Sequence, residues 1–126
     1  MHGLRRAKKS VLPRANFRSL ILVLLGRLRH CRVEGESMVP ELFSGDVVLY
    51  RPLNSNLSAL RKGSIVVASH PKKSKIFLIK RVNNVYTFGI ELLGDNQERS
   101  TDSRQFGLFD PQLIRGTVEF LIPIRT

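Results

Sequence analysis

The stretch "KIFLIKRV" at residues 75–82 is rich in aliphatic, β-branched and aromatic residues, a composition typical of a β-strand. Successive side chains of a strand point to opposite faces, so Ile76, Leu78, Lys80 and Val82 share one face. If this face is turned toward the interior, the Lys80 amine is buried among apolar neighbours. The stretch therefore predicts a strand of a sheet, with a lysine that is removed from water only if this face is turned inward.

Four further segments have the same character and are separated by turn-prone clusters rich in Gly, Pro, Asn and Ser. They lie at 46–50, 64–70, 86–94 and 116–124. The only helical turn expected between them is near 110–115. The chain after residue 32 is therefore predicted to be a compact, mainly β domain with an antiparallel sheet.

Positive charge is concentrated near the N-terminus. The net charge is +11 over 126 residues, and nine Lys and Arg precede the first acid, Glu34, whereas the remaining twelve face ten Asp and Glu. We therefore divide the chain into a basic tail at 1–32 and a single β domain at 33–126. Because the β domain is nearly neutral and has no aromatic side chains interleaved with basic ones, no nucleic acid partner is expected.

The tail combines two kinds of sequence. Residues 1–13 are polar and basic, which favours disorder. The apolar residues that follow recur at helical spacing between arginines, so a short basic amphipathic helix is expected at 14–29. Its apolar run at 20–26 is shorter than the ~20 residues that cross a bilayer. Three interpretations of the helix remain: it docks on the domain's own apolar surface, it lies on an anionic membrane, or it belongs to an organelle transit peptide. The expected location is the cytoplasm, with peripheral membrane contact through 14–29 as an addition.

Cysteine and histidine do not predict a redox or metal site. Cys31 is the only cysteine, so no disulfide forms within the chain, and a thiol nucleophile there has no evident Asn or Asp partner. The three histidines are scattered, without the spacing of metal ligands. Phosphate-binding and dinucleotide-binding motifs are absent as well. We expect neither a metal nor another cofactor.

The stretch "GESMVPELFSGDVVLY" at 35–50 places Ser37 and Met38 in a proline-containing turn ahead of a strand. Taken alone, such a serine is an ordinary turn former. A buried Lys80 changes this interpretation, because a desolvated, neutral amine can act as general base toward a serine hydroxyl. Alternatively, the Lys80 stem covers apolar surface while its amine reaches water. The loop at 94–107 is dense in the hydroxyl and carboxylate groups that would orient the amine.

Four segments resemble, in the same order, the signal peptidase family of Ser/Lys proteases. They are "GESMVPELFSGDVVL" as the nucleophile box, "KGSIVVASHP" as the next strand, "IKRV" as the lysine box, and "GDNQERSTDSRQFG" as a loop with the GDN, DSR and FG elements. Together they cover most of residues 33–118. The compact insert between the serine and lysine boxes, with no spanning anchor, is most similar to the nickel-type superoxide dismutase maturation proteases.

The resemblance assigns a role to several residues. It makes Ser37 the nucleophile, with its N–H as an oxyanion donor, and Lys80 the general base. Ser100 corresponds to the serine that orients the lysine amine, and Met38 to the residue that packs beneath the nucleophile and shapes the substrate cleft. The structural loop is represented by Gly94, Asp95, Asn96, Ser103 and the ion pair of Asp102 with Arg104.

Two positions depart from the family pattern. Gly35 stands where many members carry a serine or threonine hydroxyl that binds the oxyanion, so the second donor must be a backbone N–H or water. Glu41 stands where a threonine is common, which leaves the chemistry unchanged.

The activity that the resemblance implies is peptide-bond hydrolysis by acyl transfer, with a protein precursor as partner. The narrower resemblance makes the substrate the N-terminal leader of a nickel superoxide dismutase precursor. Three alternatives stay open: a signal peptidase acting on exported precursors, a self-cleaving repressor-type domain, and a non-enzymatic basic module that binds anionic membrane or nucleic acid. Residues 1–36 contain no Ala-Gly or Cys-Gly bond of the kind that self-cleaving relatives cut.

Overall fold

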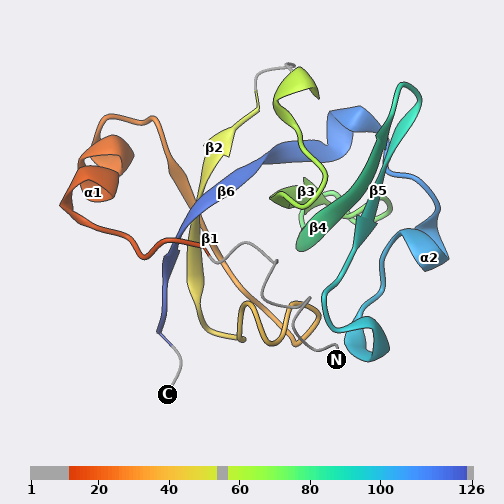
Figure 1. The fold of residues 1–126 in the computed structure, drawn as a ribbon, viewed down its shortest axis with the longest axis horizontal. Coiled ribbons are helices and arrows are strands. Elements are labelled where there is room, and N and C mark those ends of the chain that lie inside the picture. The colour runs from red at the N-terminus through yellow and green to blue at the C-terminus, as the bar shows by residue number, and fades with distance from the viewer. Residues whose placement is uncertain (1–11, 54–56, 125–126) are drawn as a thin grey trace, which may run out of the picture.

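The computed structural model describes residues 12–53 and 57–124, and in these the strands form one antiparallel sheet in the order β1-β2-β6-β3-β4-β5 (Figure 1). The strands are β1 Arg29–Arg32, β2 Val47–Pro52, β3 Ile65–Ser69, β4 Phe77–Tyr86, β5 Gly89–Leu93 and β6 Ile114–Ile122. The helical segments are α1 Phe17–Leu24, η2 Leu57–Ala59, η3 Gln97–Arg99, α2 Ser103–Phe106 and η4 Pro111–Leu113. The prediction of a mainly β, antiparallel domain preceded by a short helix is confirmed.

Apolar clusters cover both faces of the central strands. Alternation along β3 sends Val67 into one cluster and Val66 into the other. Along β4 the same alternation sends Ile79 to the first cluster and Val82 to the second. Lys80 shares a face with Val82 and is directly opposite Val66 on β3, so its stem enters the second apolar layer. Covering both faces of β4 is what buries this lysine.

The segment at 86–94, predicted as one strand, is instead divided by a turn. β4 continues to Tyr86, and β5 begins at Gly89 and runs back along it. The asparagines at 83–84, predicted to be in a turn, lie inside β4. Their side-chain amides donate to the Glu91 carboxylate of β5 at 2.7 and 3.4 Å. This cross-strand bonding satisfies the amides that would otherwise favour a turn.

The helix predicted at 14–29 is shorter than expected, and its last part is a strand. Gly26 adopts a φ of +76°, the left-handed conformation in which helices commonly end. Arg29–Arg32 then pairs with β2 as the edge strand β1. Exposed arginines on such an edge discourage pairing with other chains. The disorder predicted for 1–13 falls almost wholly on residues 1–11, outside the described part of the chain.

Helix α1 stands away from the sheet (Figure 1). Asn16 caps it by accepting the Ser19 N–H at 2.9 Å, and the segment before it is tied to Leu121 of β6. However, Phe17 is 77% exposed and Leu24 is 85% exposed. The other exposed apolar side chains here are Leu20, Ile21 and Leu25. The interpretation that this apolar face docks on the domain is therefore wrong. No helix in the described ranges has the length and apolar character needed to cross a membrane.

Candidate active site

Ser37 lies in the turn between β1 and β2. The chain reverses at Gly35, whose φ of +80° is readily adopted by glycine. Met38 is only 1% exposed and packs into the first apolar cluster, and its carbonyl accepts the N–H of Leu42 at 2.9 Å. The buried Met38 side chain thus anchors the turn, while Ser37 remains half-buried at the wall of a pocket.

The segment at 94–96 fastens this turn to the end of β5. The Asn96 N–H donates to the Ser37 carbonyl at 2.8 Å, and the Asn96 side-chain amide donates to the Glu36 carbonyl at 3.0 Å. Gly94 packs so tightly that a Cβ there would lie 2.8 Å from the Ser37 carbonyl oxygen. Gly94 and Asn96 therefore set the position of the Ser37 backbone.

Asp95 pairs with Arg81, a residue to which the sequence analysis gives no role. Two parallel bonds of 2.8 Å join the guanidinium to both carboxylate oxygens of Asp95, and Arg81 also donates to the Gly63 carbonyl at 2.8 Å. Glu41, one of the departures from the family pattern, lies 3.4 Å from the same guanidinium. Because Arg81 directly follows Lys80, this pair fixes the lysine-bearing part of β4 against the loop.

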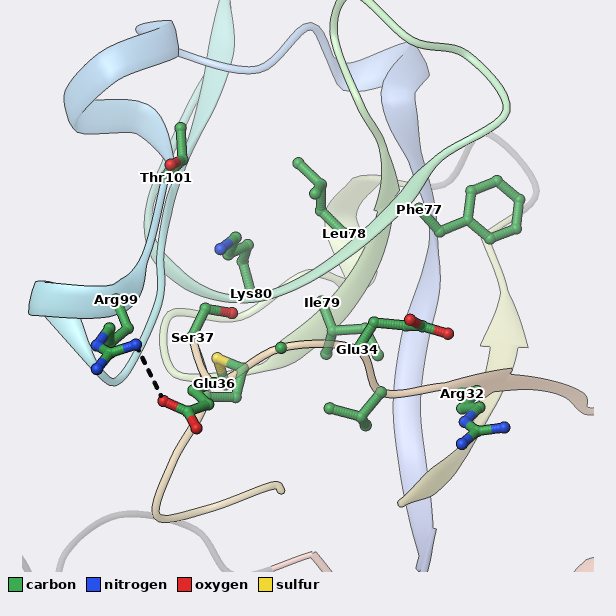
Figure 2. Close-up of a pocket in the computed structure, with 13 residues that line it drawn as sticks. Arg32, Glu34, Glu36, Ser37, Phe77, Leu78, Ile79, Lys80, Arg99 and Thr101 are labelled. Atoms are coloured by element: carbon green, nitrogen blue, oxygen red, sulfur yellow. Dashed lines mark ion pairs between the residues drawn. The ribbon is translucent and has the colours of Figure 1, made fainter. Parts of the chain in front are cut away.

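Lys80 projects from β4 into the interior and is 3% exposed. Its Nζ donates to the Ser100 Oγ at 2.9 Å. Burial lowers the pKa of Lys80 below its ordinary value of 10.5, the charge of Asp102 opposes this change, and that of Arg104 adds to it. The alternative in which the amine reaches water is therefore wrong. Lys80 and Ser37 line the same pocket (Figure 2).

Asp102 sets the direction of the Ser100 hydroxyl. Burial raises the pKa of Asp102, but hydrogen bonds from Arg104, Gly94 and Ser100 outweigh it and hold that pKa at about 2. The group is therefore a carboxylate at neutral pH and can only accept. Ser100 must donate to it, at 2.7 Å, and can only accept from Lys80. This chain of bonds uses one N–H of Lys80 and leaves the other positions of the Nζ atom, including the lone pair of the neutral amine, available to other groups.

The other loop residues with an assigned role, Ser103 and Arg104, do not line the pocket and instead fix the loop. Arg104 Nε lies 3.0 Å from Asp102 Oδ1, and its Nη2 donates to the Gln97 carbonyl at 2.8 Å. Asp102 also caps the short helix α2 by accepting the Arg104 N–H at 3.1 Å. Ser103 Oγ accepts the N–H of Leu92 at 2.9 Å, which joins the loop to β5.

The pocket that contains Ser37 and Lys80 has a volume of about 210 Å³. One wall is formed by residues 77–80 of β4, and the opposite wall by residues 32–38. An ion pair at the rim joins Arg99 to Glu36 across 3.5 Å (Figure 2). Neither rim residue could be predicted from the sequence, because exposed charges in loops have no pattern that reveals their partners.

Within residues 12–53 and 57–124, the β4 wall of the pocket has a strand edge to which no other strand pairs. β4 pairs with β3 from Phe77 to Arg81, whereas its pairing with β5 begins only at Arg81. The Val82 N–H donates to the Ser64 carbonyl, which shows that the even-numbered positions bond toward β3. Bonded positions alternate along an antiparallel ladder, so the backbone groups of Phe77 and Ile79 face the other side. An extended peptide can add a strand at such an edge.

Cys31 lies in β1, half-buried against the first apolar cluster. Burial, and to a lesser extent the charge of Glu34, raise the pKa of its thiol. Reactive thiols need the opposite environment, one that lowers the pKa. Cys31 is therefore unsuited to act as a nucleophile.

Comparison of the sequence with known proteins identifies the family. The sequence profile of the family described as signal peptidase, peptidase S26, matches residues 9–85. Mitochondrial inner membrane protease subunit 1 of Mus musculus is 30% identical across 77% of this chain and 76% of its own length. The Homo sapiens protein of the same name is 29% identical across the same shares. Mitochondrial ATP-independent inner membrane protease subunit 1a of Arabidopsis thaliana is 31% identical across 67% of this chain and 64% of its own length. The chain therefore belongs to the signal peptidase family, peptidase S26, whose members are serine peptidases acting on precursor peptides.

Proposed function

We propose that the chain is an endopeptidase in which Ser37 is the nucleophile and Lys80 the general base. The observation that carries this proposal is the buried Lys80 amine, held by Ser100 and facing the same pocket as Ser37. An exposed lysine is protonated at neutral pH and cannot accept a proton, whereas burial favours the neutral amine that can. Asp102 supports this by fixing the hydroxyl of Ser100.

The reaction follows from these positions as two acyl transfers. Ser37 Oγ attacks a peptide carbonyl while Lys80 takes the hydroxyl proton, and the Lys80 ammonium then protonates the leaving amine. Lys80, neutral again, takes a proton from water as the water attacks the acyl-enzyme. It returns that proton to Ser37 Oγ as the acyl bond breaks, so that the free serine and the neutral lysine are restored, and the product acid ionises to the new carboxylate. The Ser37 N–H is one donor to the oxyanion, and the second is a backbone N–H or water, since Gly35 has no hydroxyl.

For the substrate, we propose the N-terminal leader of a nickel superoxide dismutase precursor. This rests on the similarity of the compact serine-to-lysine insert to the nickel-type maturation proteases. The open edge of β4 suits an extended leader, because its backbone can bond to Phe77 and Ile79. Cleavage would free the α-amino group and the residues next to it that form the nickel-binding hook.

Processing of two precursors side by side tests the substrate. Purified protein is incubated with a nickel superoxide dismutase precursor and with an exported precursor bearing a signal peptide, and the masses of the products are measured. Removal of the first leader alone, and none by Ser37→Ala, supports the proposal. Cleavage of the exported precursor alone refutes the nickel superoxide dismutase substrate while retaining the peptidase. Cleavage that persists in Ser37→Ala refutes the nucleophile.

We also propose that the protein is cytoplasmic and that α1 rests on an anionic membrane surface. The apolar side chains of α1 are exposed on a helix that has no acid in its first turn. The basic residues that flank them are Arg14, Arg18, Arg27 and Arg29. A helix with exposed apolar residues and flanking arginines is typical of segments that lie in the membrane interface. The names of the relatives, which are mitochondrial inner membrane proteases, favour contact with a membrane.

Cosedimentation with vesicles containing phosphatidylserine tests the role of α1. Phe17→Ser/Leu24→Ser is expected to weaken binding by at least about tenfold, because each side chain loses roughly 1.5–3 kcal/mol of apolar burial. Phe88→Ser/Ile124→Ser serves as the matched control, since both residues are exposed apolar side chains outside α1. Equal binding by the helix variant and the control would contradict the proposal.

The value of kcat/KM for peptide cleavage is expected to rise with pH until Lys80 is neutral. Below the pKa of Lys80, the neutral fraction increases about tenfold per pH unit. Since burial lowers that pKa, the plateau should be reached below the pH at which an ordinary lysine titrates, 10.5. A pH profile of initial rates, with circular dichroism to monitor folding, measures this. A midpoint at the ordinary lysine value, or a flat profile, would contradict a general-base role for Lys80.

A further inference from the structure

Three lysines lie in the loop that leads into the pocket. Lys72, Lys73 and Lys75 are exposed and belong to residues 70–76, between β3 and β4, a segment with no acidic residue. None of the three forms an ion pair with a residue in the described ranges. The residue at which β4 then begins, Phe77, lines the pocket. The loop therefore presents unneutralised charge at the end of the substrate site.

The conformation of this lysine loop, defined as residues 70–76, is held by His70. The His70 Nδ1 accepts the N–H groups of Lys72 and Lys73 at 3.0 and 3.2 Å. The His70 N–H donates to the Ile76 carbonyl at 2.8 Å, which closes the loop. The imidazole also packs edge-on against the Phe106 ring, with 5.0 Å between centroids. Because its backbone is already ordered, the loop loses little conformational entropy when it binds a partner.

A fourth cation lies beside the same end of the pocket. The Arg115 guanidinium lies 5.8 Å from the centroid of the Phe77 ring, and its Nε donates to the Ser69 hydroxyl at 2.8 Å. Figure 2 places Phe77 at the opposite end of the pocket from Arg99. A chain bound along the β4 edge therefore runs from Lys80 past Phe77 toward positive charge on both β6 and the lysine loop.

We propose that the lysine loop and Arg115 bind an acidic segment of the precursor, close to the bond that is cut. This specificity site rests on the proposed peptidase function. An extended chain advances about 3.3 Å per residue, so the step from Lys80 to Lys75 corresponds to about five residues of substrate. The acidic residues should therefore lie roughly four to eight residues from the cleaved bond. A peptide fits better than a lipid headgroup because the lysine loop leads directly into β4, where Phe77 lines the same pocket as Ser37 and Lys80. A peptide bound in that pocket would therefore pass the lysines.

Binding to the full chain carrying Ser37→Ala separates this inference from catalysis. The probes are short fluorescein-labelled peptides with a central alanine run and an Asp-Asp-Asp group about five residues to one side or the other. Matched peptides carry Asn-Asn-Asn. The Asp peptide whose acidic group lies on the side of the lysine loop is expected to bind about tenfold more tightly than its Asn counterpart. Several exposed charge pairs together supply a free energy of this size. Fluorescence anisotropy at constant ionic strength measures the ratio.

Two variants in the Ser37→Ala background identify the surface. Lys72→Gln/Lys73→Gln/Lys75→Gln is expected to remove most of the preference for the Asp peptide. Arg18→Gln/Arg61→Gln/Lys62→Gln removes as much charge outside the pocket and is expected to keep the preference. Equal binding of Asp and Asn peptides, or the same loss in both variants, overturns the inference. It is also overturned if the lysine variant keeps the peptide preference but loses binding to phosphatidylserine vesicles, since the loop would then bind lipid.

The same peptides also allow the peptidase activity to be tested separately from acidic-segment binding. Cleavage of the Asn peptides by the protein with Ser37 intact tests the proposed chemistry and does not depend on the lysine loop. Failure of that cleavage would refute the chemistry, while the binding ratio still decides whether the loop recognises acidic residues.

Discussion

Lys80→Met abolishes peptide cleavage, with kcat/KM falling by at least about a thousandfold, and leaves the chain folded. The loss is this large because the variant has no base to take the Ser37 proton or to protonate the leaving amine. Methionine has nearly the length of lysine and is apolar, so it fits the interior position beside Val66 and Val82 in which Lys80 is buried. The fall is therefore expected in catalysis and not in folding.

The same variant should be more stable than the natural chain at neutral pH. Lys80 has a lower pKa in the folded chain than in the unfolded chain, so the unfolded chain binds its proton more tightly. Below the folded pKa this difference fully opposes folding, and it disappears as the pH rises toward 10.5. Methionine carries no proton and avoids the penalty. The free energy of unfolding is expected to rise by about 1 kcal/mol or more.

Cleavage rates and urea unfolding of the natural chain and Lys80→Met test the predicted loss of activity and the predicted gain in stability. Lys62→Met, an exposed lysine outside the pocket, is the matched control and should keep its activity. Ser37→Ala should lose activity to the same extent as Lys80→Met, because the two groups act as one unit. If Lys80→Met cleaves at the natural rate, the lysine is not the base.

Gly94→Ala is the second change with a large expected effect, with a loss of about a hundredfold in kcat. A Cβ at this position would overlap the Ser100 side chain and lie 2.8 Å from the Ser37 carbonyl oxygen. Relief of the overlap must move the nucleophile turn, the hydroxyl that holds Lys80, or both. A displacement of about 1 Å at a reacting group lowers the rate by about that factor. Overpacking also destabilises the fold by roughly 1–3 kcal/mol.

Gly116→Ala separates the two effects of the added methyl group. Its Cβ would collide with the Arg51 backbone and the Tyr50 ring, in a part of the sheet that does not line the pocket. It should therefore lower the free energy of unfolding like Gly94→Ala and leave kcat of the folded fraction nearly unchanged. Kinetics below the unfolding temperature, corrected for the folded fraction, measure the difference. Equal kcat values for the two variants would show that Gly94 does not position the dyad.

Five of the six strands, β2 to β6, could be predicted from the sequence because their composition and alternation are local properties, whereas β1 falls within the predicted basic tail. Each predicted β segment coincides at least in part with an observed strand. In β4 the alternation places Lys80 in the interior beside Val82. The loop residues at 94–104 were found through resemblance rather than pattern, since their contacts join backbone groups far apart in the chain.

The features that the sequence did not reveal depend on tertiary contacts. In the sequence, Arg81 has the features of an ordinary charged strand residue. Its role becomes visible only in the fold, where it pairs with Asp95. The β4–β5 turn was missed because the segment at 86–94 is rich in apolar and aromatic residues, and its turn at 87–88 lacks the Asn-Gly or Asp-Gly signal of a tight turn. The apolar spacing of α1 predicts a helix with one apolar face, but it does not show whether protein or solvent meets that face.

The unpaired edge of β4 makes the folding state of the substrate a condition for its cleavage. Backbone groups inside a helix, or in a strand that is paired on both sides, are occupied and cannot bond to Phe77 and Ile79. A leader that is still unstructured meets this requirement, and the folded body of the same precursor does not. With the proposed binding mode, the edge therefore selects substrates by conformation, and compact proteins whose strands are all paired are expected to resist cleavage.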